Sequence, residues 1–217
     1  MNRFARVAAL VGVLLFTAVA GLAVSGEALA RDNKQSAEAF RADVRQLWED
    51  HIVWTRQFIV SAATLPEAQL EDLGPTADRL LRNQDDIGDA VAAFYGEEAG
   101  DALAALLKDH ILIAGQLVAD VKSGSPDAAA SQAAWFANAD DIAAFLASAN
   151  PANWPFEMMQ AHMYDHLTLT AEEAVARIQG RYVDDIAAYD KIHDQILEMA
   201  DMLANGIVAQ FPNRFSR

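Results

Sequence analysis

Two short motifs alternate along this chain, and their alternation constrains the fold more than any other feature. The first pairs Asp with His before a large aliphatic residue, and it occurs as EDHI, KDHI and YDHL at residues 49–52, 108–111 and 164–167. The second ends in Asp-Asp-Ile, and it occurs as QDDI, ADDI and VDDI at residues 84–87, 139–142 and 183–186. A unit that recurs every few tens of residues indicates a repeated supersecondary structure. Each unit predicts one αα-hairpin, in which an Asp-His helix is followed by an Asp-Asp helix.

The spacing of apolar residues assigns the motifs to helices. Apolar residues recur three and four positions apart, runs of β-branched residues are absent, and glycine and proline separate the segments. Thr170 to Glu173 has the form of a capping box, which predicts a short extra helix over residues 170–180. The main helices are expected at residues 36–63, 76–94, 97–121, 127–149, 155–167 and 181–210. The expected fold is all-α, an up-down helical bundle of about six helices in three αα-hairpin repeats.

The first thirty residues have the form of a secretory signal peptide. Arg3 and Arg6 precede an apolar run over residues 7–24, and Ala28-Leu29-Ala30 is a small-residue cleavage site. The sequence predicts a signal peptide at 1–30 and a single domain at 31–217, in the periplasm or secreted. The alternative is an uncleaved membrane anchor, because the run is close to the spanning length. We expect no membrane insertion after cleavage, since no later segment looks long and apolar enough to span.

The charge and the missing motifs exclude several function classes. The net charge is −15, which disfavours nucleic acid and anionic lipid as partners. There is no cysteine, so no disulfide can form in an oxidising compartment. The chain has no nucleophile elbow, no zinc-protease motif, no P-loop and no glycine-rich dinucleotide turn. These absences favour a non-enzymatic function.

All five histidines lie on apolar stripes at helical spacing, so they are expected to face the core. Counting residues from the predicted turns places all the motifs in one layer across the middle of the bundle, within a turn or so of helix. A buried carboxylate needs a partner, and each Asp-Asp pair would have a histidine at its own height on a neighbouring helix. The sequence therefore predicts a central His/Asp layer.

Histidine and carboxylate at one level of a bundle are typical of a metal centre. His162 and His166 are four residues apart, and Asp190 lies one turn before His193 on the next helix, so these two helices form the preferred site. Neighbouring methionines favour copper, although zinc needs only the histidines and Asp. The candidate ligands, first choices first, are His162, His166, His193, Asp190, His110, His51, Asp141 and Asp86.

Two other interpretations stay open. The His/Asp layer can be purely structural, fixing helix packing in a bundle of the cell envelope that has a protein partner. The bundle can instead bind a small organic molecule between its helices, for which we expect a pocket of roughly 300 Å³ or more.

Three stretches, LWEDHIVWTRQF, NADDIAAFL and YDKIHDQILEMADMLANGIVAQFP, resemble a family of exported bacterial helical-bundle proteins. The resemblance covers most of residues 45–212. It implies a compact helical bundle, and it brings no established activity and no functional residue.

Overall fold

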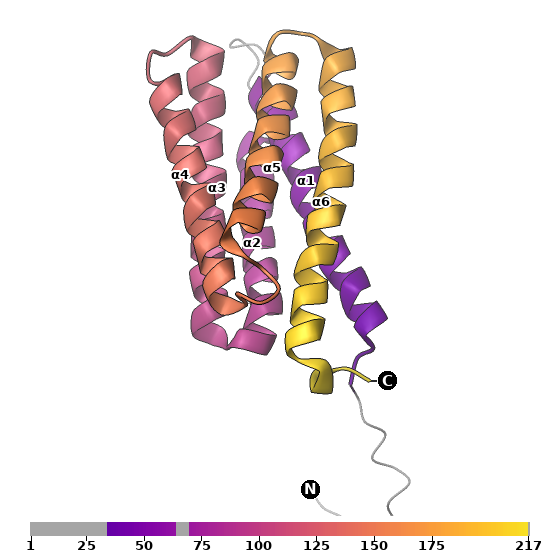
Figure 1. The fold of residues 1–217 in the computed structure, drawn as a ribbon. Helices are drawn as coiled ribbons and strands as arrows, with labels where there is room; N and C mark the ends of the chain where they lie inside the picture. Colours follow the sequence, from indigo (N-terminus) through magenta and orange to yellow (C-terminus); the bar gives the residue numbers. More distant parts are fainter. Residues whose placement is uncertain (1–33, 64–69, 217) are drawn as a thin grey trace, which may run out of the picture. The chain divides into compact units, whose positions relative to one another are not determined.

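The computed structural model describes residues 34–63 and 70–216, and this part of the chain is an up-down bundle of six α-helices (Figure 1). The predicted signal peptide, residues 1–30, lies outside the described residues. The described part contains no β-strand, and one isolated parallel bridge joins Ser36 to Ser216. A short 3₁₀ turn, Pro212–Arg214, follows the last helix. The α-helices are α1 (Ala37–Ala63), α2 (Leu73–Tyr95), α3 (Glu97–Ser123), α4 (Ala128–Ala149), α5 (Phe156–Ile178) and α6 (Tyr182–Gln210). The expected all-α fold is confirmed.

One predicted break does not exist. The sequence analysis ended a helix at residue 167 and opened another at Thr170, but α5 runs without interruption from Phe156 to Ile178. Thr170 is inside the helix, and its hydroxyl donates to the carbonyl of His166 at 2.8 Å instead of capping a new helix. Glu173, the other half of the expected capping box, binds Arg56 on α1. The prediction of a capping box and a new helix at Thr170 was wrong, because no glycine or proline interrupts the helix there.

Two turns depend on glycine. Gly96 alone separates α2 from α3, with φ at 91°. Gly124 ends α3 in the left-handed conformation, where its N–H bonds back to the carbonyls of Asp120 and Val121. Both positions have a positive φ that residues with a Cβ rarely adopt.

The order of packing brings the odd helices to the middle of the bundle. Each helix packs against the next along the chain, and α6 packs back against α1. In addition α1, α3 and α5 contact one another, whereas the even helices lack such a set of mutual contacts. The Asp-His helices therefore meet at the centre, and the Asp-Asp helices surround them.

Among the described residues, one helix is long and apolar enough to cross a membrane by length and composition, and that helix is α3. The expectation that no later segment is long and apolar enough was therefore wrong by this criterion. Leu103, Leu107 and Leu117 of α3 are buried within the bundle.

Candidate functional site

Three imidazoles, one from each hairpin, are buried together at the centre of the bundle. His51 of α1, His110 of α3 and His166 of α5 are each 3–4% exposed. The ring centroids of His51 and His166 are 5.9 Å apart, with the planes tilted by 43°. Trp48 packs against His51, and Trp135 packs against His110. We call these three side chains the histidine layer.

Amide side chains, one helix further along the chain, hold each imidazole. Asn138 Oδ1 lies 2.7 Å from His110 Nδ1, and Gln195 Oε1 lies 3.1 Å from His166 Nδ1. Gln84 Nε2 lies 3.3 Å from His51 Nδ1. In each hairpin an amide from the even helix therefore reaches the histidine of the odd helix.

The same amides also fasten the backbone of the odd helix, at an equivalent place in each hairpin. Asn138 donates to the carbonyl of Leu106, four residues before His110. Gln195 donates to the carbonyl of His162, four residues before His166. In the first hairpin Asn83 takes this part and donates to the carbonyl of Leu47, four residues before His51. The threefold repeat is thus visible in hydrogen bonds as well as in sequence.

The expected Asp–His hydrogen bonds are not formed. The side chains of Asp85 and Asp86 are about half exposed and pair with Lys108 and Arg79. Asp140 accepts hydrogen bonds from Gln160 and Tyr164, and Asp141 is exposed. An amide costs much less to bury than a carboxylate. In the first two Asp-Asp motifs the amide beside the pair therefore faces the core, and the carboxylates lie outside the histidine layer.

The third Asp-Asp motif has a different role from the first two. Asp185 is fully buried near the start of α6, where its carboxylate binds Arg56 at 2.7 Å and Arg177 at 3.3 Å. The residue that serves the histidine layer from α6 is Gln195, ten positions later. The match of VDDI to the other two motifs therefore does not mark an equivalent position.

The preferred four-ligand site on the last two helices is not assembled. His162 is half-buried, Asp190 is exposed, and His193 Nε2 lies 3.3 Å from Glu49 Oε1 on α1. Across residues 34–63 and 70–216, no group of three or more His, Asp or Glu side chains is arranged to hold a metal ion. Of the predicted ligands, the structure brings together His51, His110 and His166.

The histidine layer is neutral at pH 7. Burial lowers the pKa of His110 to about 3 and that of His166 to about 4. The pKa of His51 is also well below its usual value, first because of burial and then because of the neighbouring His166 and His110. A buried imidazolium has no carboxylate beside it here, so the uncharged ring is strongly favoured.

The hydrogen bonds distinguish His110 from the other two rings. His110 Nδ1–H donates to Asn138, and its Nε2 accepts a hydrogen bond of 3.1 Å from Trp135 Nε1. Both nitrogens of His110 are therefore used. His166 donates from Nδ1 to Gln195, which leaves the lone pair on its Nε2. Among the described residues, no hydrogen bond reaches Nε2 of His51 or of His166.

No protein-family model, curated protein or solved structure matches this chain. The geometry itself supports two kinds of chemistry at the layer. A neutral imidazole whose other nitrogen is fixed by a hydrogen bond is the form in which histidine binds metal ions. The same arrangement can also serve only to set the register of neighbouring helices.

The sequence analysis missed the amides, although the signal was present. The Asn of NQDDI and the Asn of NADDI, Asn83 and Asn138, occupy the same position before the Asp-Asp pair. Both are buried, and both donate to the backbone of the preceding helix. It also missed the buried ionic cluster of Arg56, Glu173 and Asp185, because Arg56 lies 117 and 129 positions before the two carboxylates.

Proposed function

We propose that this chain is an exported, non-enzymatic helical bundle that binds a transition-metal ion between His51 and His166. The close approach of the two rings, with centroids 5.9 Å apart, carries the proposal. Two imidazoles that share a metal at about 2.0 Å from each nitrogen have centroids within about 6 Å of each other. The leader pattern supports export, and the absence of catalytic motifs supports binding rather than catalysis.

The surroundings of the two rings support this assignment. Gln195 fixes the ring of His166, and Gln84 contacts the ring of His51. A hydrogen bond that the ring donates, as His166 Nδ1–H does to Gln195 Oε1, orients a metal-binding histidine and raises its basicity. At His51 the direction is reversed, because Gln84 Nε2–H donates to Nδ1 and the proton of the ring is therefore on Nε2. Both rings are uncharged at neutral pH, so neither has to lose an imidazolium proton before a metal binds. His166 already has a free lone pair on Nε2, whereas His51 must move its proton from Nε2 to Nδ1 and give up the hydrogen bond from Gln84. Of the residues first expected as ligands, this proposal keeps His51 and His166, and it omits the carboxylates.

Copper fits two imidazoles better than zinc does. Structural zinc is almost always bound by four ligands, and the described residues offer no group of three or more His, Asp and Glu. Imidazole and thioether ligands both suit copper. Met163 is buried one turn before His166, and Met199 is buried one turn after Gln195. The same stretch of core thus contains soft sulfur atoms.

The test is a titration of the mature chain, purified without a histidine tag, with copper(I) held by a competing chromophoric chelator. We expect one copper per chain, with a dissociation constant below about 10 µM, or roughly −7 kcal/mol. His51→Gln and His166→Gln should each abolish binding. His162→Gln and His193→Gln are the matched controls, and both should keep it.

Each other outcome has a definite meaning. If His162→Gln and His193→Gln remove copper and His51→Gln does not, the metal binds between α5 and α6 and the present proposal fails. If the wild type binds neither copper nor zinc saturably, metal binding is excluded.

A structural role is the second candidate, and His110 favours it. This ring is fully hydrogen-bonded to Asn138 and Trp135, so it offers nothing to a metal. A bundle whose histidine layer only sets helix packing would serve as an envelope protein with a protein partner. In that case His51→Gln, His110→Gln and His166→Gln would lower stability alike, and no variant would differ from the wild type in metal content.

A further inference from the structure

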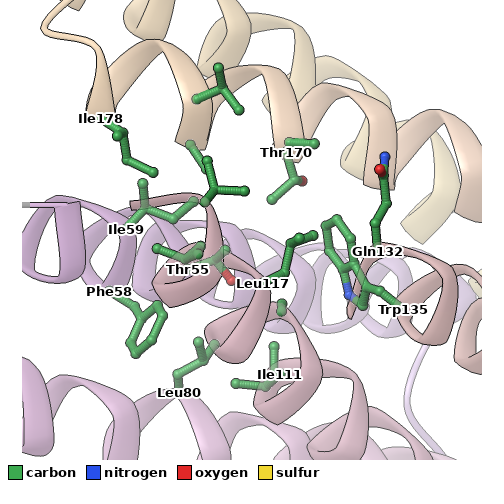
Figure 2. Close-up of a pocket in the computed structure, with 16 residues that line it drawn as sticks. Thr55, Phe58, Ile59, Leu80, Ile111, Leu117, Gln132, Trp135, Thr170 and Ile178 are labelled. Atoms are coloured by element: carbon green, nitrogen blue, oxygen red, sulfur yellow. The ribbon is translucent and has the colours of Figure 1, made fainter. Parts of the chain in front are cut away.

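A cavity lies in the turn directly beyond the histidine layer. Its volume is about 130 Å³, and its wall comes from α1, α2, α3, α4 and α5. The position follows from helical spacing, since Thr55, Ala114 and Thr170 line it and each is four residues after a histidine of the layer. Figure 2 shows large apolar side chains around this space, among them Phe58, Leu80 and Leu117.

The buried and half-buried polar groups in the wall already donate hydrogen bonds within the protein, and the remaining polar residue of the wall, Gln132, is exposed. The hydroxyl of Thr55 donates to the carbonyl of His51 at 2.8 Å, and that of Thr170 donates to the carbonyl of His166 at 2.8 Å. Trp135 donates its indole N–H to His110 Nε2. A buried water needs two to four polar partners, and these groups no longer offer donors. The interior of the cavity is therefore suited to an apolar guest and not to water.

We propose that this cavity binds a small apolar molecule of about the size of benzene. The volume of 130 Å³ is close to that of an engineered apolar cavity of about 150 Å³ that stays dry and binds benzene. The cavity is smaller than pockets for drug-sized ligands, whose volumes start at roughly 300 Å³. The ligand is therefore a single ring or a short hydrocarbon. This proposal is independent of metal binding, because it uses the turn beyond the histidines and not the imidazoles.

The cavity borders a wider groove on the surface. Gln132, Ala171 and Val175 line both the cavity and a groove of about 560 Å³ formed by α4, α5 and α6. Gln132 is exposed and makes no hydrogen bond within the described residues. The cavity and the groove are therefore neighbours, separated by side chains of α4 and α5.

The direct test is titration of the mature chain with benzene, followed in spectra of ¹³C-labelled methyl groups. We expect saturable shifts at Ile59, Leu80 and Leu117, and no shifts at Leu203, which does not line this cavity. Phenol has a similar size, and it should bind at least about tenfold more weakly because its hydroxyl would be buried without a partner. Absence of saturation by benzene, or equal affinity for phenol, would overturn the proposal.

Substitutions locate the binding. Ala174 lines the cavity and is buried, so Ala174→Leu should fill the space and abolish benzene binding. Ala130→Leu makes the same change on the exposed face of α4 and should leave binding unchanged. Unchanged binding in folded Ala174→Leu contradicts the assignment.

A second variant keeps the test decisive if Ala174→Leu does not fold. Val118 also lines the cavity, so the smaller side chain of Val118→Ala enlarges it. This variant should tighten the binding of a larger apolar ring such as naphthalene at least about threefold relative to the wild type. No change in naphthalene affinity would show that the guest binds elsewhere.

Discussion

At the scale of single residues, the histidine layer shows why amides and not carboxylates face the core. His110 is neutral because burial lowers its pKa to about 3. A neutral ring gains little from a buried carboxylate, whose desolvation costs several kcal/mol. Asn138 instead satisfies both the ring and the backbone of the preceding helix, with one oxygen and one N–H. Periodicity predicted the burial of His110, but it could not separate Asn138 from the aspartates beside it.

The pH dependence of stability should carry the signature of this ring. Because the folded pKa of His110 is about 3 and the unfolded value is 6.5, the unfolded chain binds more protons below about pH 6.5. The wild type should therefore lose up to about 1.4 kcal/mol per pH unit in that range, relative to His110→Gln. Urea unfolding of both proteins between pH 8 and pH 5 measures this difference. The difference in unfolding free energy at pH 8, where the ring is neutral in both states, reports the lost packing and hydrogen bonds of His110. Profiles of stability against pH that run parallel for the two proteins would contradict the assignment.

At the scale of elements, α2 and α3 pack so closely that side chains are excluded where they touch. A Cβ on Gly100 would lie 2.6 Å from the carbonyl oxygen of Gly88 and 2.6 Å from the Cβ of Ala92. Both neighbours belong to α2, and the carbonyl is backbone that cannot rotate away. The single-residue turn at Gly96 makes this contact local, so the hairpin formed by α2 and α3 is determined by a few small residues.

Gly100→Ala should therefore destabilise the protein although alanine favours helix. We expect a loss of about 1–3 kcal/mol from overpacking, which exceeds the gain of about 1 kcal/mol in helix propensity. Gly115→Ala is the control on the same helix, since its new Cβ would meet only the ring of Phe58 at 3.3 Å. Phe58 borders the cavity and can move, so this variant should be neutral or stabilising. If Gly100→Ala and Gly115→Ala changed the free energy of unfolding in urea equally, the close approach of α2 and α3 at Gly100 would not be the cause.

The elements also show how far sequence reasoning reached. Spacing of apolar residues, with glycine and proline between segments, was sufficient for six helices and their order. It failed at Thr170, because a hydroxyl can cap a new helix or bond back to the previous turn, and tertiary packing decides which. The repeat correctly paired His51 and His110 with the next helix. It misled at residues 183–186, where Asp185 pairs with Arg56 and no local pattern reveals that contact.

At the scale of the whole molecule, a buried ionic cluster joins the first helix to the last hairpin. Arg56 of α1 binds Glu173 of α5 at 2.5 Å and Asp185 of α6 at 2.7 Å, and its guanidinium stacks over the ring of Tyr189. Burial raises the pKa of Glu173 to about 7, against the opposing effect of Arg56. Arg56 therefore connects α1 to α5 and α6, and it supplies the positive charge that the two buried carboxylates need.

Removing the cation should be far more costly than breaking an exposed pair between the same helices. Arg56→Leu leaves Glu173 buried without its cation and leaves Asp185 with Arg177 alone. We expect a loss of about 3–5 kcal/mol at pH 7.5. Arg45→Leu is the matched control, because the exposed pair of Arg45 and Asp201 also joins α1 to α6. Such an exposed pair contributes little to stability, because solvent screens the two charges. The measurement is the free energy of unfolding in urea for both variants.

The pH dependence identifies the cause of that loss. Burial raises the pKa of Glu173 and Arg56 opposes that rise, so without Arg56 the carboxylate of Glu173 should take up a proton at a still higher pH in the folded protein. The deficit of Arg56→Leu relative to the wild type should therefore be largest at alkaline pH and shrink as the pH falls towards about 7, the pKa of Glu173 in the wild type. The deficit of Arg45→Leu should stay nearly constant over this range. A deficit for Arg56→Leu that does not change with pH would mean that lost packing against Tyr189, and not unpaired charge, opens the ring of helices.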